Sequence, residues 1–142
     1  MKIQQLSLFI ENKPGHISAP ARLLATERID IRSLYLADTE QYGIVRLIVS
    51  DWKKAFELLE THGLAVKLTE VLAVLVPDRP GGLAEVLEAL EGTGVNIEYM
   101  YAFPEKCGSQ AILIFRFDDL DAAIEHLQAA GISLLASDEL LK

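Results

Sequence analysis

Two short segments carry the residues best suited to holding a small anion. In each of them a Pro-Gly pair stands where an apolar run ends and a helix is expected to begin. Glycine has no β-carbon, so a ligand can approach the backbone, and proline fixes φ and removes an amide that would need a partner. The first amides of a helix have no acceptor in the chain and carry partial positive charge, so a carboxylate fits there. The two segments are Asn12-Lys13-Pro14-Gly15-His16-Ile17 and Asp78-Arg79-Pro80-Gly81-Gly82-Leu83.

Both segments belong to a longer internal repeat. At an offset of 66 residues, Ile29-Asp30-Ile31 aligns with Val95-Asn96-Ile97. Further along the offset becomes 68, where Asp51-Trp52 aligns with Asp119-Leu120, so the second copy contains a two-residue insertion. A period of about 70 residues is too long for a solenoid unit, and each copy is therefore expected to be a small domain with its own core. The expected domains cover residues 1–69 and 70–142.

Composition limits the partners that the chain can have. The formal net charge is -8 and the pI is near 4.8, whereas binding to nucleic acid depends on concentrated Lys and Arg. The chain begins Met-Lys-Ile-Gln-Gln without an apolar signal segment, and no apolar stretch approaches the roughly 20 residues that cross a bilayer. We therefore expect a cytoplasmic protein with neither nucleic acid nor membrane as a partner. Because halves of this size are marginal alone, we expect them to stabilise each other.

The first copy is expected to contain four strands and two helices. Pro20 is tolerated only near the first turn of a helix, so the first helix is expected to start late, with Ser18 as its cap. Asp51 is expected to open the second helix and Gly63 to end it. The strands are expected over residues 2–10, 29–37, 44–50 and 64–68, with a turn at 38–43.

The second copy predicts the same order of elements. A helix begins near Leu83 and is stopped by Gly92 and Gly94, and a second one is opened by Asp118 or Asp119. Gly131 ends that helix as Gly63 ends its counterpart. The strands are expected over 71–76, 95–103, 111–117 and 132–135, with the insertion in a hairpin loop at 104–109.

Strand-helix-strand-strand-helix-strand is the ferredoxin-like order. The expected fold class is therefore α+β, with two ferredoxin-like βαββαβ units, each an antiparallel sheet with its helices on one face. Strands such as 45–49 and 112–115 are apolar on both sides, and one helix layer covers only one side. We therefore expect a homodimer in which sheets or helices of two chains pack together.

The duplicated pattern resembles a known family. A strand ending in Asn-Lys-Pro-Gly or Asp-Arg-Pro-Gly, then a helix, then Ile-Asp-Ile or Val-Asn-Ile at the next strand, is similar to the ACT domain, twice over. The resemblance covers nearly the whole chain and implies a free-standing tandem ACT protein. Such domains bind small effectors, most often amino acids, and regulate metabolic enzymes or transcription. The resemblance thus implies an allosteric regulatory protein without catalysis or a cofactor, with an amino acid effector and a metabolic enzyme as partners.

In the family the effector usually lies at an interface between two domains, against the loop after the first strand. Asn12 matches a loop position that often contacts the polar end of the ligand, and Asn96 matches a second polar contact. Their counterparts, Asp78 and Asp30, repel a carboxylate but can accept hydrogen bonds from an ammonium group, so we expect two unequal sites. A pocket joining the Asn12 loop with Asn96 across the domain interface is one expectation. The expected ligand-binding residues are Asn12, Pro14, Gly15, His16, Ile17, Asp30, Ile31, Asp78, Pro80, Gly81, Gly82, Leu83, Asn96 and Ile97.

Other interpretations stay open. Taken alone, Asn12 and Asp78 are typical of residues that close a turn through their side chains. The chain could also be a regulatory or scaffolding subunit that binds another protein through its open sheet and takes no small molecule. RNA-recognition modules share the topology, and Phe115 and Phe117 could stack on bases, but the basic surface is missing.

Signatures of an enzyme or a metal site are scarce. The three histidines lack tight metal-ligand spacing, and Cys107 has no adjacent histidine to activate it. We expect no metal ion and no catalytic nucleophile.

Overall fold

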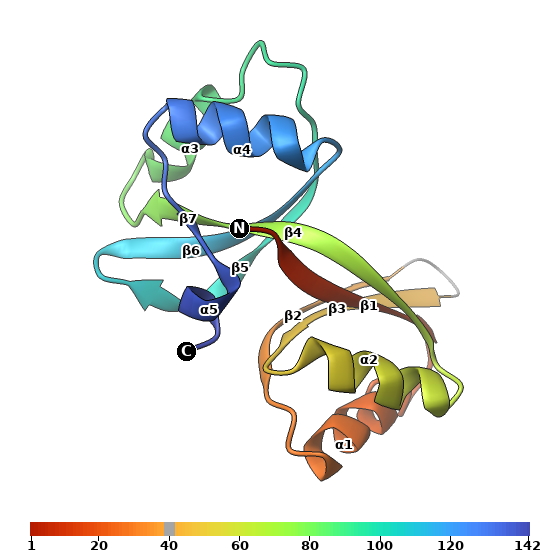
Figure 1. The fold of residues 1–142 in the computed structure, drawn as a ribbon. Coiled ribbons are helices and arrows are strands. Elements are labelled where there is room, and N and C mark those ends of the chain that lie inside the picture. Colours follow the sequence, from red (N-terminus) through yellow and green to blue (C-terminus); the bar gives the residue numbers. More distant parts are fainter. Residues whose placement is uncertain (39–41) are drawn as a thin grey trace. The chain divides into compact units, whose positions relative to one another are not determined.

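The computed structural model describes residues 1–38 and 42–142. Within these residues the chain forms seven strands and five helices (Figure 1). It divides into two compact units, one of residues Gln4–Thr69 and the other of Glu70–Lys142 together with Met1–Ile3. Each unit is described by itself.

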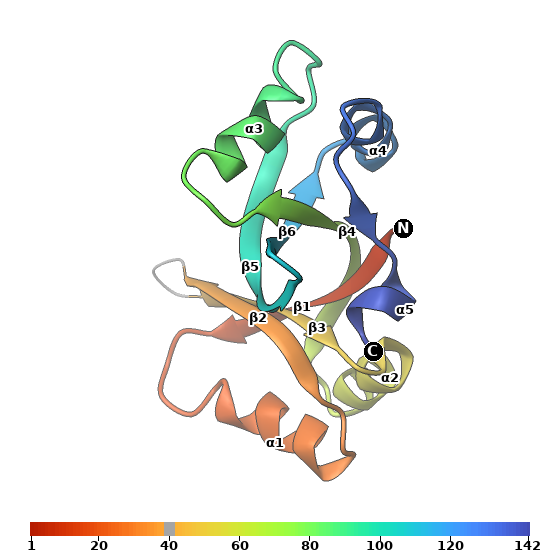
Figure 2. The ribbon, with the colours of Figure 1, turned by 90° about the vertical axis from the view of Figure 1, so that its left-hand side faces the viewer.

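The unit Gln4–Thr69 is a four-stranded antiparallel sheet with two helices. Its elements are β1 (Ile3–Glu11), α1 (Ser18–Thr26), β2 (Ile31–Asp38), β3 (Tyr42–Val49), α2 (Trp52–Thr61) and the beginning of β4 (Ala65–Pro77). The strand order is β2-β3-β1-β4. Leu47 of β3 lies opposite Leu6 of β1 on one side and Leu34 of β2 on the other. The two helices lie on the same face of this sheet (Figures 1 and 2).

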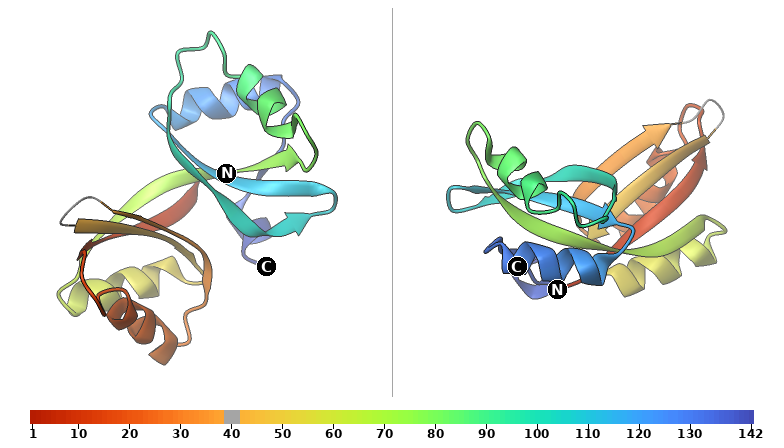
Figure 3. Two further views of the ribbon diagram at one scale, coloured as in Figure 1. Left: turned by 180° about the vertical axis from the view of Figure 1, so that it is seen from behind. Right: turned by 90° about the horizontal axis from the view of Figure 1, so that it is seen from above.

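The second unit repeats this architecture. After β4 come α3 (Gly82–Glu88), β5 (Ile97–Cys107), β6 (Gln110–Phe117), α4 (Leu120–Ala129), β7 (Leu134–Leu135) and α5 (Ser137–Leu140). The strand order is β5-β6-β4-β7, which matches the order of the first unit strand for strand. Figure 3 shows α3 and α4 together on one face of the sheet. The expected pair of ferredoxin-like units is confirmed.

Each unit has its own apolar core between sheet and helices. In the first unit alternate residues of β1, including Leu6 and Leu8, pack with Ala55 and Leu59 of α2, and all four are fully buried. In the second unit the Phe115 and Phe117 rings stack with centroids 5.4 Å apart, within the cluster that contains Leu127 of α4. Burying one such aliphatic side chain contributes about 1.5–3 kcal/mol. The apolar stripes of the helices therefore fix which face each sheet presents to them.

The N-terminal residues belong to the second unit. Lys2 Nζ lies 3.0 Å from Asp121 Oδ1 of α4, and Gln128 Nε2 donates to Met1 Sδ at 3.3 Å. The hydrogen bond to Asp121 and the charge of that carboxylate raise the pKa of Lys2 above its ordinary value. The pair is therefore intact at neutral pH and is lost as the pH rises through the raised pKa of Lys2.

Two strand expectations were wrong. The segments 64–68 and 71–76 form one continuous strand, β4, because no turn residue interrupts them. In the second hairpin, β5 runs on to Cys107, and the turn contains only Gly108 and Ser109. The pairing jumps between Phe103 and Lys106, so the two inserted residues form a bulge within the strand. One of them is Pro104, which has no amide to donate to the ladder. The expected turn at 38–43 falls mostly on residues 39–41, which lie outside the described residues.

Helix boundaries also differ from the expectation. The first helix does begin at Ser18, but Ile17 holds the cap position and makes no side-chain cap hydrogen bond, so Ser18 is not the cap. Pro20 is the third helical residue, where its missing amide costs nothing. The α3 helix ends at Glu88, before Gly92, because the amides of Ala89, Leu90 and Glu91 bond three residues back and tighten the chain into turns.

A reciprocal pair of hydrogen bonds holds the start of the second strand in both units. The Asp30 N–H donates to Ser50 Oγ at 2.9 Å, and the Ser50 N–H donates to the Asp30 carbonyl oxygen at 2.9 Å. In the second unit the Asn96 N–H donates to Asp118 Oδ1 at 2.8 Å, and the Asp118 N–H donates to the Asn96 carbonyl oxygen at 3.1 Å. Asp118 therefore corresponds to Ser50, and its hydrogen bonds fix the residue just before β5.

In each unit, the aspartate that follows this Ser50 or Asp118 position caps the next helix. Asp51 Oδ1 accepts from the Lys54 N–H at 3.1 Å, and Asp119 Oδ1 accepts from the Ala122 N–H at 3.0 Å. Asp119, and not Asp118, is thus the residue that opens α4.

We predict that Asp51→Ala and Asp119→Ala each lower the free energy of unfolding by about 1 kcal/mol, because each leaves a helix amide without its acceptor. Asp51→Asn keeps a side-chain acceptor and is the matched control. Urea unfolding followed by circular dichroism measures the difference. Equal stability of the Ala and Asn variants at position 51 would contradict the assignment of the cap.

Candidate functional site

The candidate site is organised by a tight turn between the first strand and the first helix of each unit. Gly15 and Gly81 both have φ near +85°, and ψ of Gly81 is -8°. The amide two residues after each proline closes the turn: His16 donates to the Lys13 carbonyl at 3.4 Å and Gly82 to the Arg79 carbonyl at 2.9 Å. These are type II turns, which favour proline at the second position and require a positive φ at the third. Glycine is needed there because other residues are strained at this φ.

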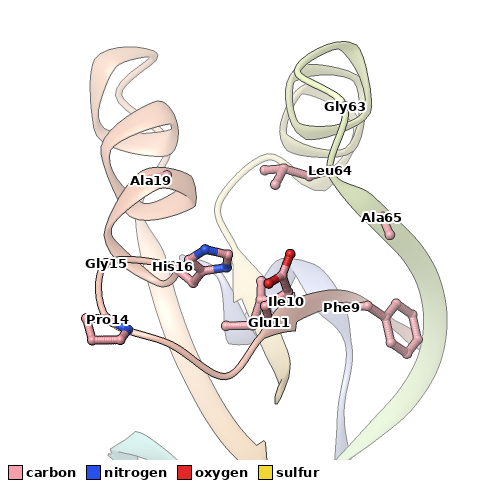
Figure 4. Close-up of a pocket in the computed structure, with 10 residues that line it drawn as sticks. All are labelled: Phe9, Ile10, Glu11, Pro14, Gly15, His16, Ala19, Gly63, Leu64 and Ala65. Atoms are coloured by element: carbon pink, nitrogen blue, oxygen red, sulfur yellow. The ribbon is translucent and has the colours of Figure 1, made fainter. Parts of the chain in front are cut away.

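In the first unit the turn forms one wall of an open groove of about 560 Å³. The end of β1, the turn, the first helical turn of α1 and the corner between α2 and β4 all contribute to it. Figure 4 shows the His16 ring and the Glu11 carboxylate turned toward each other across this space, with Leu64 above them. The lining residues are Phe9, Ile10, Glu11, Pro14, Gly15, His16, Ala19, Gly63, Leu64 and Ala65.

The groove offers both signs of charge to a ligand. Glu11 is exposed, and its Oε2 lies 3.3 Å from Lys13 Nζ at the edge of the turn. The opposite wall is the start of α1, where no side chain caps the helix and the first amides carry partial positive charge. His16 is partly buried between them. The groove can therefore hold a zwitterion, with an anion at the helix and a cation at Glu11.

The second unit has a counterpart at the equivalent place. This pocket, of about 280 Å³, is lined by Leu75, Pro77, Glu85, Val86, Gln110, Ala130, Gly131, Ile132 and Ser133. Its charges differ, because Pro77 stands in place of Glu11 and Glu85 in place of Ala19. Arg79 Nη2 lies 2.6 Å from Glu85 Oε1, and Lys106 forms an ion pair with Asp78.

Only part of the expected site is brought together in the first unit. Pro14, Gly15 and His16 line the groove, while Asn12 is exposed at the start of the turn. Ile17 and Ile31 instead line a separate apolar cavity of about 260 Å³ between α1 and the sheet.

Asp30 lies at the opposite end of the sheet from the turn. Glu11, which precedes the turn, pairs with Tyr42 at one end of β3, whereas Ile31 pairs with Val49 at the other end. Within one unit, then, Asp30 cannot share a site with the Pro14 turn.

The second unit shows the same separation. Pro77, which precedes the turn, pairs with Gln110, and Ile97 pairs with Phe117 at the far end of β6. Asn96 is exposed there, and its backbone forms the reciprocal pair with Asp118. The pocket that would join the Asn12 loop with Asn96 draws on both units and remains a prediction.

The remaining expected residues of the second turn have no place in its pocket lining. Asp78, Pro80, Gly81 and Leu83 are exposed. Gly82 is buried, and a β-carbon there would lie only 1.9 Å from the Pro77 carbonyl oxygen.

The sequence did not predict seven of the ten residues that line the groove. Phe9, Ile10 and Glu11 at the end of β1, Ala19, and the corner 63–65 contribute to the lining. The repeated helix-ending pair Gly63 and Gly131 was a visible signal for that corner. Its approach to the Pro-Gly turn depends on tertiary packing, which the pattern does not encode.

No group of three or more His, Cys, Asp or Glu side chains in residues 1–38 and 42–142 is arranged to hold a metal ion. In the same residues, the helices are too short or too polar to span a membrane.

Comparison with known proteins decides the family. A family model described as an ACT domain pair matches residues 1–142. The chain belongs to the ACT domain pair family. The resemblance of the two Pro-Gly segments to this family is thereby confirmed.

Solved structures share the architecture of this ACT domain pair. Protein BT0572 from Bacteroides thetaiotaomicron is 39% identical with a TM-score of 0.92, over 100% of this chain and 97% of that one. The regulatory subunit of aspartate kinase from Thermus thermophilus is 21% identical with a TM-score of 0.63, over 89% and 91%. The corresponding subunit from Thermus flavus is 19% identical with a TM-score of 0.60, over 90% and 92%. These two subunits share the fold of the chain. A comparison with curated proteins gave no match.

We predict that Gly82→Ala costs more stability than Gly15→Ala. The added β-carbon at position 82 would meet the Pro77 backbone, at a cost of about 3 kcal/mol. At position 15 nothing lies within 4 Å of the added atom, and only the positive φ is strained, at about 1–2 kcal/mol. Urea denaturation of both variants measures the order. Gly15→Asn is the control, since asparagine tolerates this φ better than alanine. Equal costs at positions 15 and 82 would contradict the close approach of residue 82 to the Pro77 backbone.

Proposed function

We propose that this ACT domain pair is a regulatory protein that binds a free α-amino acid in the groove of its first unit and conveys the binding to a metabolic enzyme. The observation that carries the proposal is the groove itself, in which Glu11 and His16 face each other beside the uncapped start of α1. Family membership and the fold shared with aspartate kinase regulatory subunits support the regulatory part.

The carboxylate of the amino acid is placed at the start of α1. The Pro14-Gly15 turn presents the first helical turn to the groove, and Ala19 has too small a side chain to cover it. Hydrogen bonds from unpaired amides to a carboxylate are charge-assisted and stronger than neutral ones. The helix dipole adds roughly 0.3–1 kcal/mol in the same direction.

The ammonium group is placed at Glu11. This carboxylate already holds the Lys13 ammonium at 3.3 Å, on a turn residue whose side chain is largely exposed. An exposed pair of this kind contributes about 0–1 kcal/mol, so a ligand ammonium can replace Lys13 at little cost. His16 then lies beside the bound molecule, and Leu64 and Phe9 supply apolar surface for its side chain.

The response to binding is proposed to be allosteric. The groove joins three separate elements, β1, α1 and the α2–β4 corner, so a ligand that contacts all three favours one arrangement of them. Leu34 and Leu36 on the edge strand β2 are each 52% exposed and provide an apolar surface for association with a second copy or with an enzyme in the cytoplasm.

The test is a thermal-shift screen of the full chain against each standard α-amino acid. A bound amino acid at 100 times its dissociation constant adds about 2.7 kcal/mol to the free energy of unfolding. We predict that Glu11→Gln removes most of that shift, because the neutral amide no longer pairs with the ammonium group. Glu57→Gln, on the exposed side of α2 and outside the groove lining, is the matched control and keeps the shift.

A screen in which no amino acid raises the unfolding temperature would contradict the proposed ligand class. A shift that survives Glu11→Gln unchanged would place the binding site elsewhere.

A further inference from the structure

We infer that the chain carries one working amino acid site and one closed one: in the second unit the Glu85 carboxylate, held by Arg79, fills the position that a ligand carboxylate takes in the first unit. The inference rests on the proposed function and specifies its stoichiometry, one amino acid per pair of repeats.

The two pockets are equivalent by position in the repeat. At the offset of 66, Phe9 corresponds to Leu75, Glu11 to Pro77 and Ala19 to Glu85, and at the offset of 68 the corner 63–65 corresponds to 131–133. All of these residues line their own pocket. Differences between the pockets therefore arise from side chains on a shared scaffold.

Glu85 is the decisive difference. Alanine at position 19 leaves the first turn of α1 open, whereas Glu85 sits at the same position of α3 and lines the second pocket. Arg79, which replaces Lys13, holds this carboxylate at 2.6 Å. A carboxylate already present near a helix start interacts with the partial positive charge there and repels a second anion.

The place of the ammonium group is also lost. Pro77 replaces Glu11, so the end of the strand carries no acidic side chain. The two acidic groups nearby are already paired, Glu85 with Arg79 and Asp78 with Lys106. What the second unit lacks is an acidic side chain at the end of the strand, where Glu11 stands in the first unit.

The second turn is also packed more closely against its strand. A β-carbon at Gly82 would lie 1.9 Å from the Pro77 carbonyl oxygen, so no side chain can take the place of His16. The second pocket is about 280 Å³, half of the 560 Å³ of the first. The smaller volume and the different charges of the second pocket therefore both oppose binding of an amino acid there.

The test is equilibrium dialysis of the full chain against the standard α-amino acids, with three variants. Wild type is expected to bind one equivalent. Pro77→Glu combined with Glu85→Ala copies residues 11 and 19 into the second unit and is expected to bind two. Ala19→Glu copies residue 85 into the first unit and is expected to weaken binding about tenfold or more. Glu88→Ala, an exposed change on the same helix as Glu85, is the matched control and keeps one equivalent.

The outcomes separate this inference from the proposed function. Two equivalents in wild type, or one equivalent in a folded variant carrying both Pro77→Glu and Glu85→Ala, overturn the inference and leave the proposed function standing. Unchanged affinity in Ala19→Glu also overturns the inference, and this variant supplies the answer if the double variant does not fold. No binding by wild type overturns both.

Discussion

The Pro-Gly type II turn is the constraint on which the rest of the molecule's proposed chemistry depends. With φ near +85° at Gly15, the chain leaves β1 and enters α1 within a few residues, without a capping side chain at the helix start. Hydrogen-bond donors that a cap would normally occupy are therefore presented at the sheet end. The α2–β4 corner meets this end of the sheet and turns the bare helix start into a groove.

Because the chain contains the same unit twice, the two units can be compared directly with each other. Both units keep the turn geometry, the capping aspartates Asp51 and Asp119, and the reciprocal hydrogen bonds that begin β2 and β5. These shared features fix the fold, and the difference between Ala19 and Glu85 stands on that common scaffold. A change from an open helix start to one filled by the chain's own ion pair is what we expect when one copy keeps a ligand and the other keeps only its structure.

Most of the fold could be predicted from the sequence because it depends on local signals: the apolar runs, the two Pro-Gly turns, the helix-opening aspartates and the helix-ending glycines. One error occurred where a long-range partner decides the outcome. Pro104 is typical of a loop, but β5 continues beyond it because Lys106 and Cys107 pair with β6, and Pro104 lies in a bulge. The candidate site was harder for the same reason. Position in the repeat identified His16, but the part played by Glu11 and the corner 63–65 depends on how strand ends and helices pack, and Asp30 lies at the opposite end of the sheet.

The most direct test of the central claim is a ¹H–¹⁵N NMR titration of the full chain with the amino acid that most raises its unfolding temperature. The account predicts saturable shifts at the amides of Gly15, His16, Ala19 and Gly63, with their counterparts Gly81, Gly82, Glu85 and Gly131 little changed. Shifts of equal size at both sets would contradict a single open site, and shifts at neither set would contradict binding at the Pro-Gly turn.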